Sequence, residues 1–264
     1  MEYSGWIYRF RGVGTGTAEE REKTFERELN AIRERKFWFS SIANYNDPFE
    51  FILLSELERF GHQGQLFGGG PRDREFWLRY LLRHGVCCFC MDSENGPINQ
   101  LMWAHYAQEH FGFAIGLQTE NFEYPIGRPI TYSATPHKWD DSDTQSAPDQ
   151  LAKLRGMEKQ LGNITYRKHE CWKYENEFRI LNDGANLLQG QYGAVKWPFE
   201  RIYFGARMTA EHKCRIRDAG GSELEYLDSL LDETGYSMKF RPSSFELENT
   251  HLNTYFGPSA DDAV

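Results

Sequence analysis

The chain has 264 residues, of which 40% are hydrophobic and 26% are charged, fractions that are ordinary for a soluble globular protein. Its 30 Lys and Arg residues against 39 Asp and Glu residues give a net charge of −9, which argues against nucleic-acid binding by overall charge alone. No apolar run approaches the ~20 residues that span a bilayer, no signal-peptide pattern opens the chain, and five Cys suit reduced thiols, so we expect a cytoplasmic protein without a membrane segment.

The first half of the chain alternates short apolar runs with helical patterns. Thr17 followed by Glu20 is a capping-box pattern, and Phe25, Leu29 and Ile32 follow it at helical spacing. The expected elements in chain order are a strand at 5–10, a helix at 18–35, a strand at 37–41, helices at 49–60 and 74–84, a strand at 86–91, a helix at 99–109, and strands at 111–117 and 129–133.

The second half predicts fewer elements and two loops. The expected elements are a helix at 148–161, strands at 175–181 and 201–205, and a helix at 210–219, with flexible loops near 61–72 and 136–150 and a frayed tail at 257–264. Strands and helices interleave without a regular β-α-β order. We therefore predict an α+β fold, a single domain over residues 1–256 with a mixed, mostly antiparallel sheet and flanking helices.

A pair of carboxylates is the first candidate site. On a strand at 175–181, alternation places Glu175, Glu177 and Arg179 on one face. Two like charges at this spacing raise each other's cost of ionisation. The pattern indicates either an exposed face with paired charges or a carboxylate pair at the mouth of a cleft, where one group polarises a hydroxyl or stabilises a cationic transition state.

Two further residues carry alternative interpretations. Arg9 on the first strand is either an ordinary strand-edge residue or a phosphate ligand that uses its planar guanidinium. His105, flanked by Trp103 and Tyr106, is either a hydrogen-bonded core residue or a catalyst.

Several common sites are not supported by the sequence. Cys87, Cys88 and Cys90 lie in an apolar strand without a second Cys pair at zinc spacing, so we expect buried thiols and no metal. The glycines at 12, 14 and 16 do not form the dinucleotide fingerprint, and no Walker sequence is present. A Rossmann or P-loop enzyme is therefore not expected.

Six blocks together resemble a bacterial family, the domain-of-unknown-function family 2971, from about residue 6 to about residue 215. The specific blocks are Asn46-Asp-Pro-Phe-Glu50 and Met102-Trp-Ala-His-Tyr106. The second of these belongs to a block that begins at Leu101 and includes Phe111-Gly-Phe113. The others are Trp6–Arg11, Phe37–Ile42, Cys87–Met91 and Trp172–Arg179. The name of this family implies no activity.

A second, weaker resemblance implies a chemistry. ADP-ribosyltransferases of the Arg-Ser-Glu class have an Arg on the first strand, then a strand with a Ser, and further on a strand with Glu-x-Glu. The same order occurs here as Arg9, Ser40 or Ser41, and Glu175-x-Glu177. The resemblance implies an ADP-ribosyltransferase-like fold and NAD as cofactor. Arg9 would hold the pyrophosphate, Ser40 or Ser41 would support the nicotinamide ribose, and Glu177 would stabilise the oxocarbenium-like transition state. The long stretch between Ser41 and Glu175 departs from that class.

In this hypothesis His105 lines the same cleft, and Trp103 or Tyr106 stacks on a base or on nicotinamide. The protein would be a toxin or an anti-phage effector that modifies an unknown macromolecule, protein or nucleic acid, and an antitoxin could neutralise it.

Two other functions stay open. A metal-dependent nuclease or hydrolase would use Asp47, Glu50, Glu175 and Glu177, although Arg179 stands where such enzymes have a Lys. A non-catalytic nucleotide- or peptide-binding module would use Trp38, Trp103 and Trp172.

Overall fold

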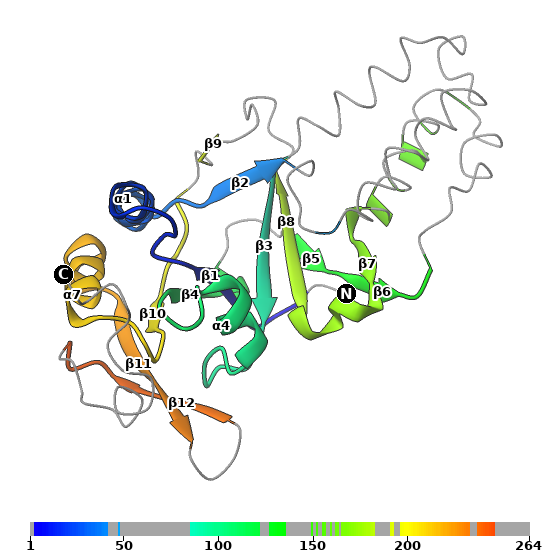
Figure 1. The fold of residues 1–264 in the computed structure, drawn as a ribbon. Coiled ribbons are helices and arrows are strands. Elements are labelled where there is room, and N and C mark those ends of the chain that lie inside the picture. Colours follow the sequence, from blue (N-terminus) through cyan, green and yellow to red (C-terminus); the bar gives the residue numbers. More distant parts are fainter. Residues whose placement is uncertain are drawn as a thin grey trace. The chain divides into compact units, whose positions relative to one another are not determined.

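The computed structural model describes residues 3–41, 47, 85–121, 127–135, 149, 152, 155–156, 159, 162–163, 165–182, 191–192, 196–232 and 237–245 (Figure 1). The chain forms two compact units, each assembled from three stretches. Unit 1 consists of Met1–Tyr3, Lys36–Met91 and Glu123–Val195, and unit 2 consists of Ser4–Arg35, Asp92–Phe122 and Lys196–Val264. Neither unit is therefore a continuous segment of the sequence.

Unit 2 is built on a mixed sheet. Its strands are β1 (Trp6–Arg11), β4 (Phe113–Gln118), β10 (Arg201–Phe204), β11 (Glu225–Asp232) and β12 (Ser237–Pro242). They lie in the order β12-β11-β10-β4-β1. β10 and β11 run parallel, and the other neighbours are antiparallel, with Trp6 opposite Gln118 at the start of β1. Ile7 and Tyr8 of β1 are fully buried, so this central sheet carries much of the core.

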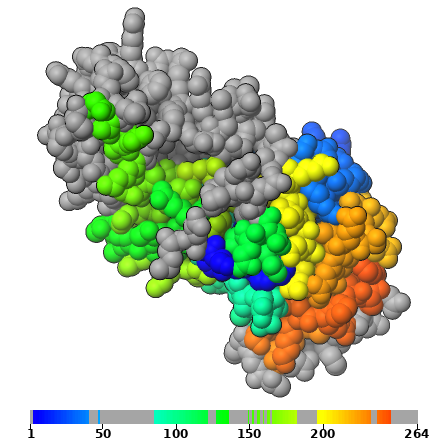
Figure 2. All heavy atoms as spheres, turned by 180° about the vertical axis from the view of Figure 1, so that it is seen from behind, coloured from blue at the N-terminus to red at the C-terminus, as the bar shows by residue number. Residues whose placement is uncertain are grey.

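Two helices of unit 2 pack against each other. The helices of this unit are α1 (Ala18–Glu34), α4 (Gln100–Tyr106), the 3-10 turn η3 (Thr119–Asn121) and α7 (Ala210–Gly220). α1 begins at the expected capping box, in which Thr17 and Glu20 bond each other's backbone N–H groups at 2.8 and 3.3 Å. Its apolar face is buried, and α1 (blue) lies beside α7 (orange) in Figure 2. Arg215 of α7 bonds Glu22 and Glu26 of α1 across this contact.

Unit 1 contains antiparallel strands and a small parallel pair. Its strands are β2 (Trp38–Ser41), β3 (Gly85–Met91), β5 (Gly127–Pro129), β8 (Glu177–Asn182) and β9 (Gln191–Tyr192), together with β6 (Thr131–Ser133), β7 (Arg167–His169) and the 3-10 helix η4 (Glu170–Glu175). The first five pair antiparallel in the order β9-β2-β3-β8-β5, and β6 pairs parallel with β7. β3 is buried on both faces, as its continuous apolar sequence predicts.

The α+β class with mixed, mostly antiparallel strands is confirmed. The strand expected at 175–181 begins only at Glu177, because Glu175 ends a 3-10 helix and Asn176 takes a left-handed conformation with φ 43°. The helix expected at 99–109 is shorter, ending at Tyr106. The single domain over residues 1–256 stays a prediction.

Some expected elements lie outside the described residues. These are the helices at 49–60 and 74–84, the loop at 61–72 and the tail at 257–264, and of the loop near 136–150 only residue 149 is described. Within the helix expected at 148–161, residues 152, 155, 156 and 159 are helical and the remainder is not described, apart from residue 149.

Gly112, directly before β4, lies at a close approach of two backbones. A Cβ there would lie 2.1 Å from the carbonyl oxygen of Arg11 and 2.9 Å from that of Ala107. Because backbone atoms cannot rotate away, we expect Gly112→Ala to lower the free energy of unfolding by roughly 3 kcal/mol in urea denaturation. Gly221→Ala is the control, since no atom lies within 4 Å of that Cβ position and only its φ of 75° is strained. Equal losses in both variants would contradict this steric explanation.

Candidate functional site

The residues predicted for the site are divided between the two units. Unit 1 contains Ser40 and Ser41 on β2, Glu175 at the end of η4, and Glu177 at the start of β8. Unit 2 contains the others, which are Arg9 on β1 and Trp103, His105 and Tyr106 on α4. The transferase hypothesis requires Arg9 to converge with Ser40 and Glu177, a condition that involves both units and stays part of that hypothesis.

Within unit 1, Ser40 and Glu177 share a sheet face but are not neighbours. Ser40 lies opposite Val86 of β3, whereas Glu177 lies opposite Cys90 of the same strand. Val86 and Cys90 are four residues apart and point to the same face. Four residues along a strand and two strand spacings separate Ser40 from Glu177 by roughly 16 Å. Their side chains are thus too far apart for a direct hydrogen bond.

The two carboxylates are bridged by a lysine from another strand. Lys168 Nζ of β7 lies 2.5 Å from Glu175 Oε2 and 3.3 Å from Glu177 Oε2. Arg179 donates from Nε to Glu177 Oε1 at 2.6 Å and from Nη2 to Oε2 at 3.2 Å. We call Lys168, Glu175, Glu177 and Arg179 the ion network. It contains two positive and two negative groups, so its formal charge is balanced.

Burial corrects one interpretation of this pair. Glu175, Glu177 and Arg179 are 3%, 4% and 1% exposed, so the exposed charge-paired face is wrong. Glu177 pairs with Arg179, but within the protein interior rather than on an exposed face. A buried charge pair is tolerated only when its partners satisfy it, and both oxygens of Glu177 are bonded here. A role for Glu177 at a ribose hydroxyl would require one of these bonds to open.

The environment keeps Glu177 ionised. Burial alone would raise its pKa, but the adjacent charge and hydrogen bonds of Arg179, with Lys168, outweigh burial and lower the pKa from 4.5 to about 2. The backbone N–H of Glu177 also donates to the hydroxyl of Tyr132 at 2.8 Å, and burial raises the pKa of that phenol. The carboxylate is therefore negatively charged at any physiological pH.

A pocket of about 210 Å³ lies in the same unit. Its lining residues come from β5, β6, β7 and the residues just before β7, and they are Arg128, Pro129, Thr131, Asn163, Tyr166 and Arg167. We call it the Arg128–Arg167 pocket. None of these six described residues is acidic, and two are cationic. The pocket is therefore a local positive site in a chain of net charge −9.

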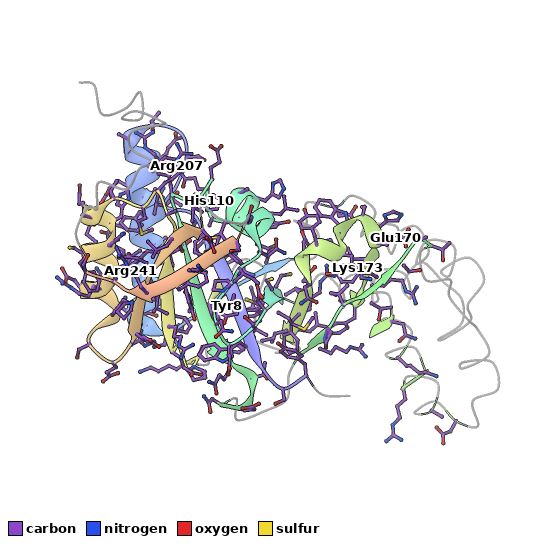
Figure 3. All side chains as sticks on the ribbon, turned by 90° about the horizontal axis from the view of Figure 1, so that it is seen from below. Tyr8, His110, Glu170, Lys173, Arg207 and Arg241 are labelled. Atoms are coloured by element: carbon purple, nitrogen blue, oxygen red, sulfur yellow. The ribbon has the colours of Figure 1, made fainter. Side chains whose placement is uncertain are left out.

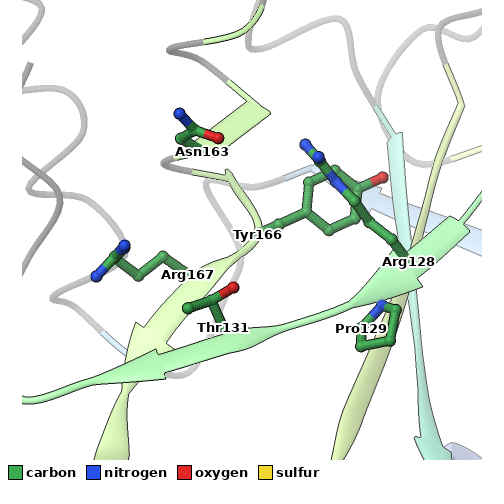
Figure 4. A pocket seen from close by; sticks show the side chains of 6 residues that line it. All are labelled: Arg128, Pro129, Thr131, Asn163, Tyr166 and Arg167. Carbon is green, nitrogen blue, oxygen red and sulfur yellow. The ribbon is translucent and has the colours of Figure 1, made fainter. Parts of the chain in front are cut away.

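The two arginines of the pocket are held differently. The guanidinium carbon of Arg128 lies 3.9 Å from the centre of the Tyr166 ring, a cation–π contact. Arg167 lies on the other side of the pocket, with Thr131 between the two arginines (Figure 4). The Nε of Arg167 is buried and has no hydrogen-bond partner. Buried donors are nearly always satisfied, so this nitrogen is an exception among the buried donors.

The sequence did not indicate this pocket or the role of Lys168. Their residues lie on short strands far apart in the chain, and no local motif joins them. The only signal was the run Tyr166-Arg-Lys-His169, in which three successive basic residues follow an aromatic. On β7 its alternation directs Lys168 to the carboxylates and leaves Arg167 to line the pocket.

Of the candidate residues on α4, Trp103 is part of the core of unit 2. Trp103 is fully buried, its indole N–H donates to the carbonyl of Pro97 at 2.6 Å, and its ring meets Phe10 edge-on. A ligand ring could stack on Trp103 only if this packing opened. His105 is exposed, so its interpretation as a core histidine is wrong, and Tyr106 is half-buried.

The turn after α4 is strained. Gln108, Glu109 and His110 all have positive φ angles, of 48°, 52° and 71°, which non-glycine residues rarely adopt. The ring of His110 stacks on Trp103, and its Nδ1 is buried without a partner. The carbonyl of His110 accepts from the backbone N–H of Arg207, its neighbour in Figure 3. Burial lowers the pKa of His110, and the charge of Arg207 lowers it further.

This histidine should make stability depend on pH. Below its ordinary pKa of about 6.5 the unfolded chain binds a proton that the folded ring resists. Stability is therefore full above that pH and falls as pH drops towards the lowered folded pKa. We expect His110→Gln to lose less stability than wild type between pH 7.5 and 5.5 in urea denaturation. Burial also lowers the pKa of His212, so the variant would still show the pH dependence of stability that His212 causes. Identical losses in variant and wild type would contradict the role of His110.

Metal and membrane functions gain no support from the described residues. Among them, no group of three or more His, Cys, Asp or Glu side chains could hold a metal ion. Asp47 is buried in unit 1, and Glu50 lies outside the described residues. On β3, Cys87 and Cys90 are buried as expected, Cys88 is half-buried, and none of the three forms a disulfide. None of the helices described combines the length and the apolar composition that crossing a bilayer needs.

Comparison with known proteins finds one match. Comparisons with curated proteins and with solved structures find none. The family match covers the region from α4 to β8, which includes the ion network and the Arg128–Arg167 pocket. Residues 102–180 match the model of a family described as "Protein of unknown function (DUF2971)", and the resemblance to that family is confirmed over this part of the chain.

Proposed function

We propose that this protein binds a phosphate-bearing small molecule of the nucleotide type, with the phosphate in the Arg128–Arg167 pocket. The observation that carries the proposal is Arg167, which lines a pocket with no acidic residue among those described and whose Nε has no hydrogen-bond partner. A planar guanidinium matches phosphate oxygens in charge and geometry.

The size and polarity of the pocket favour a charged group over a whole ligand. Its 210 Å³ lies below the ~300–1,000 Å³ of pockets that enclose a drug-sized molecule. The hydroxyl of Thr131 and the amide of Asn163 add neutral donors to the two guanidinium groups. A phosphate or diphosphate would occupy the pocket, and the rest of the nucleotide would lie outside it.

ADP-ribosyl transfer from NAD is the specific form of this proposal. The observation that favours it is the presence of a cationic pocket and the ionised Glu177 in one unit, because NAD carries a pyrophosphate. The transfer would require Glu177 to exchange its bond to Lys168 for one to the ribose. A macromolecular acceptor, an antitoxin, and a toxin or anti-phage role belong to this form of the proposal.

Calorimetric titration with pyrophosphate, ADP, NAD and adenosine tests the binding proposal. We expect the three phosphate-bearing ligands to bind and adenosine to bind at least tenfold more weakly. Equal binding of adenosine and ADP, or no binding of any ligand, would overturn the binding proposal.

Nicotinamide release from NAD tests the transfer. Glu177→Gln should abolish this release while the variant stays folded. If ADP binds but no nicotinamide is released from NAD, the phosphate-binding proposal stands and the transferase proposal is overturned.

A further inference from the structure

The ion network and the pocket are built from the same short strands. On β7, Arg167 lines the pocket and the next residue, Lys168, bridges the two carboxylates. On β6, Thr131 lies opposite Arg167 in the parallel pair, and Tyr132 accepts from the backbone of Glu177. Each strand therefore presents one residue to the pocket and the next to the network.

Arg179 connects the network directly to the segment that carries Arg167. Two of its nitrogens grip Glu177, and the third, Nη1, donates to the carbonyl of Thr165 at 2.6 Å. Thr165 is two residues before Arg167. The residue between them is also fixed, because Tyr166 donates its N–H to Gly162 at 3.0 Å and its carbonyl accepts from Thr131 at 2.8 Å.

Glu177 fixes the other side of the pocket, formed by residues 128–131, through its backbone. Its carbonyl accepts from the N–H of Ile130 at 2.9 Å, between the pocket residues Pro129 and Thr131. Arg128 lies opposite Arg179 in the pairing of β5 with β8. Arg179 and Glu177 thus hold the two walls, and Glu175 does not contact either wall in the bonds named here.

We propose that Arg179 is a positioning residue for phosphate binding: gripped by Glu177, it holds the Thr165 carbonyl and so sets the place of Arg167 in the pocket. This inference rests on the proposed phosphate site. In this inference the residues Glu177 and Arg179 of the Glu-x-Glu-x-Arg sequence support a binding site without touching the ligand themselves.

The test compares two changes within the network. Arg179→Lys keeps the positive charge but cannot reach both Glu177 oxygens and the Thr165 carbonyl at once. Glu175→Gln removes a bond to Lys168 and leaves Arg179 with Glu177 and Thr165. By calorimetry with ADP, we expect Arg179→Lys to bind at least tenfold more weakly than wild type and Glu175→Gln to bind within twofold of it. Unchanged binding by Arg179→Lys, or equal losses in both variants, would overturn the proposal.

A second measurement separates this proposal from the phosphate site itself. The Nε–Hε resonance of Arg167, assigned by its loss in Arg167→Lys, reports on the order of this side chain without ligand. We expect one sharp signal in wild type and in Glu175→Gln, and a broadened or shifted signal in Arg179→Lys or, if that variant does not fold, in Glu177→Asp. An unchanged signal would overturn the positioning role, whereas wild type that does not bind ADP would overturn only the proposed function.

Discussion

Glu177→Ala should lower the free energy of unfolding by about 3–5 kcal/mol, since it removes one partner of a buried ion pair and leaves the other charged. Of the partners named above, Arg179 would keep the Thr165 carbonyl and Lys168 would keep Glu175, so the buried guanidinium would lose its carboxylate. Urea denaturation at pH 7 measures the change. Glu170→Ala is the matched control, because Glu170 is exposed on η4 (Figure 3) and its loss should cost less than about 0.5 kcal/mol. Similar losses in both variants would mean that the ion network does not stabilise the fold.

The same carboxylate sets a pH window. The pKa of Glu177 is lowered from 4.5 in the unfolded chain to about 2 in the fold, so its contribution is complete above pH 4.5 and is lost as pH falls towards 2. We expect wild type to lose about 3 kcal/mol more than Glu177→Ala across that window. Parallel stability curves for the two proteins would contradict the ionised state of Glu177.

Arg167→Ala should weaken ADP binding by about ten- to a hundredfold, since a hydrogen bond to a charged group contributes about 1.5–3 kcal/mol. Arg167→Lys should recover part of the affinity, because it restores the charge without the planar fork. Calorimetry at one fixed salt concentration measures both. Arg155→Ala is the control, since Arg155 is an exposed arginine of unit 1 that does not line the pocket. If Arg155→Ala weakened binding as much as Arg167→Ala, the effect would be one of net charge alone.

The elements predicted best from the sequence were those whose pattern is local. The capping box at Thr17 and the apolar spacing of Phe25 and Leu29 specify α1 without reference to the remainder of the chain. Four strands were missed, which are β7, β9, β11 and β12. In β11 the polar residues Asp228 and Ser229 are buried beside Leu227, so the alternation that marks a half-buried strand is absent. Asp228 is buried because Lys213 of α7 pairs with it at 2.7 Å, which no local pattern shows.

The candidate site was predictable only in part, for the same reason. Glu175, Glu177 and Arg179 are close in sequence, so their grouping could be foreseen. Their bridging partner Lys168 comes from a different strand, and its pairing decides that the group is buried rather than exposed. Arg128 and Arg167 line one pocket only because β5, β6 and β7 assemble, so the sequence alone did not indicate a phosphate pocket.

The aromatic content of 15% is explained mostly by packing in the described residues. Trp6, Tyr8, Phe10 and Trp103 are all buried in unit 2. The nucleotide- or peptide-binding module that would use Trp38, Trp103 and Trp172 draws on both units and stays a hypothesis. Within unit 1 the aromatic residues instead accompany cations: Tyr166 lies under Arg128, and the ring of Trp172 lies 4.7 Å from Lys168 Nζ.

The position of a bound phosphate tests the central claim most directly. A crystal structure of the full chain with ADP would locate it. We expect a phosphate oxygen within hydrogen-bond distance of the guanidinium of Arg167, whose Nε has no partner in the protein. An ADP molecule bound with its phosphates outside the Arg128–Arg167 pocket would contradict the claim.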